Sequence, residues 1–154
     1  MRGWSKKWFS HKFKGPGLRY EIAVSIKKGD IVWIAGPYIC GKWNDLAIFR
    51  DGLIYELEEN ERVEADNGYR ALDPEFVKTR TGFSTKKGDR KDMTNKVRAR
   101  QETVNKRLKQ FQCLVQPFRH CDFEKHSNLV RAAAVVTQLA IQNGEPLFQI
   151  EYHN

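Results

Sequence analysis

Apolar and polar residues alternate near the start of the chain in the manner of a β-hairpin. Residues 18–26 alternate after the turn signal Gly15-Pro16-Gly17, and residues 31–35 form a second apolar run that ends at Gly36-Pro37. Lys28-Gly29-Asp30 stands between the two runs and is typical of a tight turn. The pattern therefore predicts two paired strands.

A helix and a short strand are predicted next. Asn44 or Asp45 can cap the helix, because a short side-chain oxygen satisfies the free N–H groups of a first turn. Apolar residues behind this cap recur at roughly helical spacing: Leu46, Ile48, Phe49, Leu53, Ile54 and Leu57. Residues 62–65 then form a short strand that ends at Asp66. Residues 70–95 have little periodicity and predict a loop insertion at the surface.

Two longer helices are predicted in the second half of the chain. Residues 95–111 carry an apolar stripe at helical spacing: Val97, Val104, Leu108 and Phe111. Residues 113–118 fit a short strand. Ser127 can cap a final helix that runs through Ile141 and ends at Asn143-Gly144. The order of elements predicts an α/β fold in a single domain over residues 1–154.

Length and composition are those of a soluble globular protein. The chain has 154 residues, 40% hydrophobic and 30% charged, which is enough for one core. No apolar stretch has the length of a membrane span, and the first eight residues lack the apolar stretch of a secretion signal. Three cysteines are an odd number for a disulfide framework. We therefore expect a nuclear or cytoplasmic protein that is not secreted.

Positive charge is concentrated in two blocks, and the formal net charge is +8. Residues 1–30 hold eight Lys and Arg against two acids, residues 78–109 hold twelve against three, and residues 31–77 have a surplus of acids. This distribution favours a polyanion as partner, with nucleic acid the leading candidate. A basic soluble protein without such a partner is the alternative.

Asp66 and Glu102 are the candidate catalytic residues. Cleavage of a phosphodiester needs an activated water and a stabilised leaving oxygen, and two divalent cations held by carboxylates supply both. An Asp at a strand end and a Glu on a helix suit that task. Each also has a simpler interpretation: Asp66 opens an Asp-Asn-Gly turn, and Glu102 can pair with a basic residue four positions away.

Four blocks of the sequence carry a resemblance to a known family: "SKKWFSHKFKGPGLRYEIAVSI", "GDIVWIAGPYICGKWNDLAIFRD", "ERVEADNGYRA" and "RQETVNKRLKQF". In this order they resemble the DDE-superfamily endonuclease domain of Harbinger-like and related insertion-sequence transposases. The resemblance covers nearly the whole chain. It implies an RNase H-like fold, a mixed sheet flanked by helices, and metal-dependent cleavage and transfer of DNA strands at transposon ends and target.

The resemblance also implies roles for three acids. Asp66 matches the second catalytic Asp, in the "D-x-G-Y" block. Glu102 matches the closing Glu of the triad, in "R-Q-E-T-V-N-K-R". Asp45 matches the acid of "N-D-x-x-I-F", an accessory metal neighbour and also a possible helix cap. The implied cofactor is Mg²⁺ or Mn²⁺.

One departure from the family concerns its first catalytic Asp, which lies on an opening strand ahead of the first block. Residues 1–20 contain no Asp or Glu, and Glu21, on the next strand, is not expected to substitute. We therefore expect a domain truncated at its N-terminus with impaired activity. The alternative is a non-catalytic DNA-binding remnant of a transposase. Loss of a central strand would expose apolar faces, so we also expect marginal stability and self-association.

The basic residues expected to bind DNA fall in two groups. The first interleaves cations with Trp4 and Trp8, which suits a phosphate backbone or unstacked bases; the second flanks Glu102. They are Lys6, Lys7, His11, Lys12, Lys14, Arg98, Arg100, Arg107 and Lys109. A solvated basic face is the alternative. A zinc site built from Cys113, His120, Cys121 and His126 is disfavoured, because their spacing does not form two close pairs.

Overall fold

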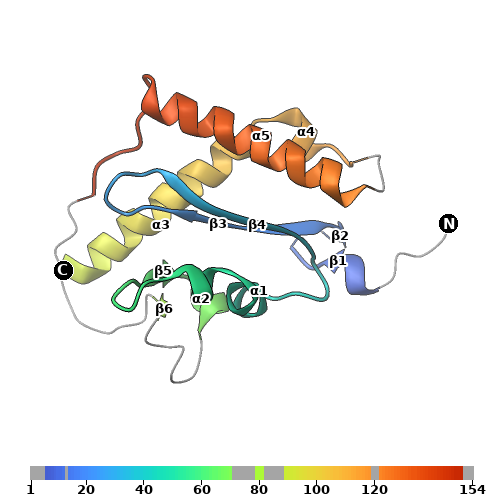
Figure 1. Ribbon diagram of the computed structural model, residues 1–154, viewed down its shortest axis with the longest axis horizontal. Helices are drawn as coiled ribbons and strands as arrows, with labels where there is room; N and C mark the ends of the chain where they lie inside the picture. Colours follow the sequence, from blue (N-terminus) through green and yellow to red (C-terminus); the bar gives the residue numbers. More distant parts are fainter. Residues whose placement is uncertain (1–5, 13, 71–78, 82–88, 119–121, 151–154) are drawn as a thin grey trace. The chain divides into compact units, whose positions relative to one another are not determined.

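The computed structural model describes residues 6–12, 14–70, 79–81, 89–118 and 122–150 (Figure 1). The chain divides into two compact units. The first unit comprises residues 1–21 and 35–85, and the second comprises residues 22–34 and 86–154. The prediction of a single domain over residues 1–154 stays a prediction.

A β-hairpin supplies strand segments to both units. It consists of β3 (Leu18–Val24) and β4 (Ile31–Ile39), as the alternating pattern predicted. The Ser25 N–H donates to the carbonyl of Asp30 (2.8 Å) and the Gly29 N–H to that of Ser25 (2.9 Å). Gly29 has a φ of +80°, which a glycine adopts without steric cost. The predicted turn is confirmed.

The second strand is longer than predicted, because β4 continues through Gly36-Pro37 to Ile39. Proline lacks an N–H donor, yet each strand of a two-stranded sheet has a free edge where no donor is needed. Gly36 has a φ of +129°, and a methyl group there would lie 2.8 Å from the carbonyl oxygen of Arg19. Only glycine lets the strand bend at this point and go on.

The first unit begins with η1 (Lys6–Trp8), followed by β1 (Phe9–Ser10), which pairs antiparallel with β2 (Gly15–Pro16). The predicted helix forms as α1 (Asp45–Asp51), a break at Gly52, and α2 (Leu53–Glu56). Asn44 is the cap: its Oδ1 accepts from the N–H of Ala47 (2.7 Å). Ile48, Phe49 and Leu53 are buried.

The predicted short strand is β5 (Val63–Ala65), which the 3₁₀ turn η2 (Asn67–Tyr69) follows. β5 pairs in parallel with β6 (Thr79–Thr81), which lies inside the segment predicted as a loop. That prediction is wrong for residues 79–81. Three residues are too short for a period to be recognised, so only the partner strand reveals β6.

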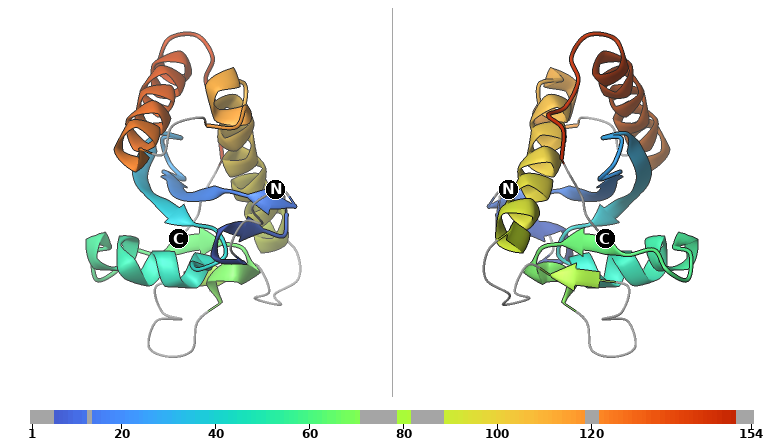
Figure 2. Two further views of the ribbon diagram at one scale, coloured as in Figure 1. Left: turned by 90° about the vertical axis from the view of Figure 1, so that its right-hand side faces the viewer. Right: turned by 90° about the vertical axis from the view of Figure 1, so that its left-hand side faces the viewer.

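The second unit is built on α3 (Asp89–Leu108), α4 (Gln112–Val115) and α5 (Phe123–Gln142). α3 and α5 are in contact and inclined to each other (Figure 2). Their buried side chains form one core with Leu147: Val104, Leu108, Ala133, Ala134 and Ile141. Ile22, Val24, Ile31 and Ile34 of the hairpin pack against this core.

Two helix starts and one element type in this unit differ from the prediction. α3 begins at Asp89, within the predicted loop, and residues 112–115 form a helix where a strand was predicted. α5 begins at Phe123, because Asp122 and not Ser127 is the cap. The Oδ1 of Asp122 accepts from the N–H groups of Glu124 (3.0 Å) and Lys125 (3.1 Å). The predicted end at Asn143-Gly144 is confirmed.

The predicted α/β composition is confirmed, since the structure combines helices with strands. The described strands form three two-stranded sheets, so the RNase H-like mixed sheet stays a prediction. No described helix combines the length and apolar character that crossing a membrane requires. Val135, Val136 and Leu139 are exposed on α5, which is compatible with the predicted self-association without testing it.

Arg100 connects three segments of the second unit. Only 3% of the residue is exposed. Its Nη1 donates to the carbonyl of Ile26 (2.6 Å), its Nη2 donates to the carbonyl of Phe148, and its guanidinium lies over the Phe148 ring (5.7 Å). Burial lowers the pKa of Arg100. Its two terminal nitrogens donate to backbone carbonyls, so the structure gives Arg100 a role within the fold. Its role in DNA binding stays a prediction.

We therefore expect Arg100→Met to destabilise the second unit. The change leaves the carbonyl oxygens of Ile26 and Phe148 without this donor and should lower the free energy of unfolding by about 3 kcal/mol. Urea denaturation followed by circular dichroism measures it. Lys106→Met, at an exposed position of the same helix, is the control and should change it by less than about 0.5 kcal/mol. Equal unfolding midpoints for the two variants would contradict the role of Arg100.

Candidate functional site

Asp66 directly follows β5 and is the cap of η2. Its Oδ1 accepts a hydrogen bond from the N–H of Gly68 (2.8 Å). The interpretation of Asp66 as a turn former is therefore confirmed. The hydrogen bond uses one carboxylate oxygen and fixes the direction of the side chain, which is exposed. The turn and a role in chemistry are compatible.

Asp45 lies beside Asp66, and Gly68 separates them. A methyl group on Gly68 would lie 2.5 Å from Oδ2 of Asp45 and 3.0 Å from Oδ1 of Asp66. The first distance is too short for a real Cβ and the second is tight, so a side chain at this position would force the Asp45 carboxylate to move. Asp45 is the first residue of α1, and Asn44 rather than Asp45 caps it.

Arg19 of β3 compensates the charge of Asp45. Its Nη1 donates to Oδ1 of Asp45 at 2.8 Å. About a third of each side chain is exposed, 32% for Arg19 and 38% for Asp45. Solvent therefore screens the pair, and its contribution to stability is modest. Its direct consequence is geometric, because it holds the Asp45 carboxylate near Gly68.

Tyr69 lies among the acids of the first unit. Its ring packs edge-to-face on Phe49, with 6.1 Å between the ring centroids, and its hydroxyl donates to the carboxylate of Glu21. Burial, and then the negative charges of Glu21, Asp45 and Asp66, raise the pKa of Tyr69. The phenol therefore stays protonated and can act as a donor.

The sequence pattern put Glu21 on a strand but gave it no role in the site. It is only 4% exposed and is the one buried position of β3. An acid within the alternating run of a strand is unusual in a core, and this was the available signal. Which acids and which tyrosine it faces depends on segments more than twenty residues away.

Glu102 lies on α3 in the second unit and is exposed. Asp66 belongs to the first unit. The two units are described separately, so the predicted convergence of Asp66 and Glu102 stays a prediction. What the structure brings together is Asp66 with Asp45, and these with Tyr69 and Glu21.

The predicted DNA-binding residues are exposed in the first group and mixed in the second. Lys6, Lys7, His11, Lys12 and Lys14 are all exposed. Lys7 Nζ lies 5.8 Å from the centre of the Trp8 ring. In the second unit Lys109 is exposed, Arg98 is half-buried, and Arg107 donates to the carbonyl of Glu145 (2.6 Å). Arg100 of the same group is buried.

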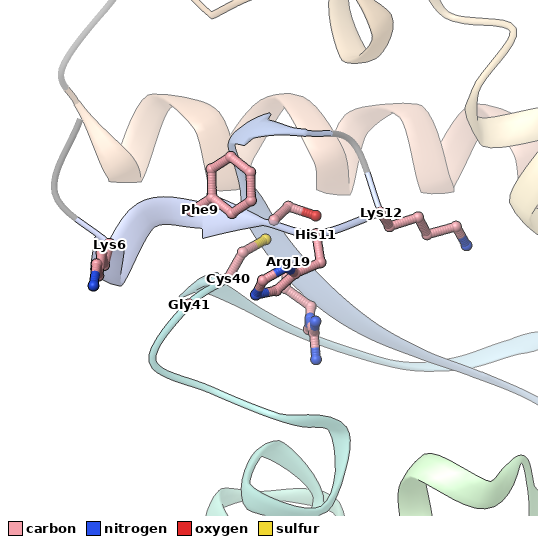
Figure 3. A pocket seen from close by; sticks show the side chains of 8 residues that line it. Lys6, Phe9, His11, Lys12, Arg19, Cys40 and Gly41 are labelled. Atoms are coloured by element: carbon pink, nitrogen blue, oxygen red, sulfur yellow. The ribbon is translucent and has the colours of Figure 1, made fainter. Parts of the chain in front are cut away.

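A hollow of about 770 Å³ lies in the first unit beside these exposed cations (Figure 3). It is lined by Lys6, Phe9, Ser10, His11, Lys12, Arg19, Cys40 and Gly41. The lining combines four basic side chains with one aromatic ring and contains no acid. Arg19 belongs both to this hollow and to the ion pair with Asp45.

The carboxylates are the type of ligand that a hard divalent cation binds. Asp45 and Asp66 offer the oxygen ligands that Mg²⁺ and Mn²⁺ prefer, and each has a carboxylate oxygen close to Gly68. Among the described residues no group of three or more His, Cys, Asp or Glu is arranged to hold a metal. Of the disfavoured zinc set, His120 and Cys121 lie outside the described residues.

Comparison with known proteins identifies the family. The family model described as DDE superfamily endonuclease matches residues 4–138 of the chain. The chain belongs to the DDE superfamily endonuclease family. The match includes Asp45, Asp66 and Glu102, and it supports a transposase-derived nuclease as the origin of the domain. No curated protein and no solved structure matched.

We expect the free energy of unfolding of Tyr69→Phe to fall less steeply with rising alkaline pH than that of the unmodified chain. An unfolded tyrosine titrates near pH 10, and the raised pKa of Tyr69 means that the unfolded chain releases its proton first. The contribution of Tyr69 to stability is therefore complete below about pH 10 and declines above it. The variant should be less stable by about 1 kcal/mol at neutral pH and should decline less steeply.

Urea unfolding between about pH 8 and pH 11 measures this dependence. Tyr55→Phe is the matched control, because Tyr55 is 79% exposed. It should keep the slope of the unmodified chain. Equal slopes for both variants would show that Tyr69 is not held among the acids.

Proposed function

We propose that this chain is a transposase-derived DDE endonuclease domain that cleaves DNA strands with a divalent cation. The carrying observation is that Asp66, at the end of β5, lies beside Asp45 across Gly68, within a chain that the DDE superfamily endonuclease model matches over residues 4–138. A Harbinger-like origin is the finer proposal, and the four sequence blocks support it.

In this proposal Asp66 and Glu102 hold the cation, Mg²⁺ or Mn²⁺, and Asp45 is an accessory ligand. When bound, the cation lowers the pKa of an attacking water and stabilises the leaving oxygen. The hydrogen bond from the Gly68 N–H to Asp66 restricts the carboxylate to one orientation. Asp45 is the weaker ligand, because Arg19 already compensates its charge.

The basic residues supply the affinity for DNA. Lys6, Lys7, His11, Lys12 and Lys14 are exposed within one short segment of the first unit. Each lysine that neutralises a phosphate releases a condensed counterion, which is the main source of non-specific affinity. Transposon ends and target DNA are the proposed substrates, and the nucleus the proposed location.

A non-catalytic DNA-binding remnant is the second candidate. The observation that favours it is that both candidate ligands of the first unit have a structural partner: Asp66 accepts from the Gly68 N–H, and Asp45 accepts from Arg19. These hydrogen bonds account for both acids without a metal. The two candidates differ in turnover and agree in DNA binding.

Metal-dependent nicking of supercoiled DNA tests the first candidate. With Mg²⁺ or Mn²⁺ we expect the purified chain to nick, and Asp66→Asn and Glu102→Gln to nick at least about 100-fold more slowly, since removing a ligand should cost at least as much as removing a residue that orients one. Asp66→Asn retains an oxygen for the Gly68 N–H, so the turn should survive. Glu59→Gln, at an exposed position, is the control.

Nicking that is unaffected by either substitution would refute these two ligands. If neither the unmodified chain nor any variant nicks DNA, and DNA binding is retained, the result selects the remnant.

The salt dependence of DNA binding tests the basic segment. We expect Lys7→Gln combined with Lys14→Gln to reduce the slope of log K against log salt by about 2, or roughly one for each phosphate that is no longer neutralised. Lys27→Gln with Lys28→Gln removes the same charge from the exposed turn of the hairpin and is the control. Fluorescence anisotropy on a labelled duplex over a series of salt concentrations gives the slopes. Identical slopes for both pairs would place the DNA elsewhere.

A further inference from the structure

We propose that the hollow of the first unit binds one unstacked nucleotide of a DNA strand. This inference rests on the proposed function, because it assigns a subsite for the same substrate. It concerns the space bounded by η1, β1 and the end of β4 (Figure 3), whose lining includes neither Asp45 nor Asp66.

The size of the hollow favours a nucleotide over a bare phosphate. A volume of about 770 Å³ lies within the range of small-molecule sites, and a phosphate group would fill only a small part of it. Phosphates of an intact duplex lie on a convex surface and would meet the rim rather than enter.

The lining offers separate partners to a phosphate and to a base. Lys6 and Lys12 are exposed cations at the edge of the hollow. Phe9 is 37% exposed and stands edge-to-face with His11, with 5.3 Å between the ring centroids. A partly exposed ring can stack on any base, and stacking of this kind tolerates all sequences.

The wall of the hollow is held together by backbone hydrogen bonds. The Gly41 N–H donates to the carbonyl of Lys7 (2.9 Å), and the Gly17 N–H donates to that of Trp8 (3.0 Å). A methyl group on Gly41 would collide with the carbonyl oxygens of Lys6 and Lys7. Glycine at this position lets η1 close against the end of β4, so the hollow is part of the fold of the first unit.

Arg19 links the hollow to the carboxylates. Its side chain lines the hollow, and its Nη1 holds Asp45, which lies across Gly68 from Asp66. Arginine has five donors, so a phosphate can be bound while the ion pair remains. A nucleotide in the hollow would place the neighbouring stretch of strand beside the acids.

Three labelled DNAs test the proposal: a blunt duplex, the same duplex with a short unpaired overhang, and that overhang with abasic nucleotides. The two overhangs carry equal charge and differ only in their bases. We expect the chain to bind the intact overhang about tenfold more tightly than the abasic one. Phe9→Leu should abolish this difference and leave the affinity for the blunt duplex unchanged.

Phe123→Leu is the matched control, because Phe123 is a 45% exposed aromatic residue of the second unit. It should preserve the tenfold difference. Urea unfolding of both variants checks that the fold is retained. Equal binding of intact and abasic overhangs by the unmodified chain would overturn the nucleotide site while the proposed nuclease stands. Failure to bind any of the three DNAs would overturn both.

Discussion

The candidate site depends on the close approach of two carboxylates to one glycine. Asp45 and Asp66 carry like charges, which repel each other and oppose such an arrangement. Two donors offset the repulsion: the Arg19 guanidinium on Asp45 and the Gly68 N–H on Asp66. Glycine suits this position because a Cβ would lie 2.5 Å from Oδ2 of Asp45, which would force that carboxylate to move. The "D-x-G-Y" block of the family therefore has a direct steric explanation in this chain.

The same block explains the position of Tyr69. Tyr69 is one residue after Gly68. Its ring packs on Phe49 of α1, and its hydroxyl donates to Glu21 of β3. Asp45 also belongs to α1, and Arg19 to β3. The turn after β5 is thus held against α1 by a ring contact and against β3 by a hydrogen bond, and an ion pair joins β3 to α1. These contacts fix the position of Asp66 relative to Asp45. A metal ligand needs a fixed position more than it needs exposure.

The hairpin that supplies segments to both units is secured differently in each. In the second unit Gln138 of α5 bonds two adjacent residues at the end of the hairpin turn: Oε1 accepts from the Ile31 N–H (2.8 Å), and Nε2 donates to Oδ1 of Asp30 (2.6 Å). Arg100 adds the bond to Ile26. In the first unit, Gly36 admits Tyr20 and the Arg19 carbonyl against the bend in β4. Contacts at the turn and at the bend in β4 therefore both fix the hairpin that carries Arg19 and Glu21.

The sequence by itself determined the features that depend on neighbouring residues. The hairpin turn, the cap at Asn44, the strand ending at Asp66 and the helix end at Asn143 were all predictable, because turns and caps are built from residues a few positions apart. Only the tertiary structure decided that Arg100 is buried, that Glu21 meets Tyr69, that β6 pairs with β5, and that Asp45 and Asp66 share Gly68. These features join segments from 16 to 74 residues apart, and burial depends on which distant surfaces meet. The local pattern of hydrophobic residues does not specify which distant surfaces meet.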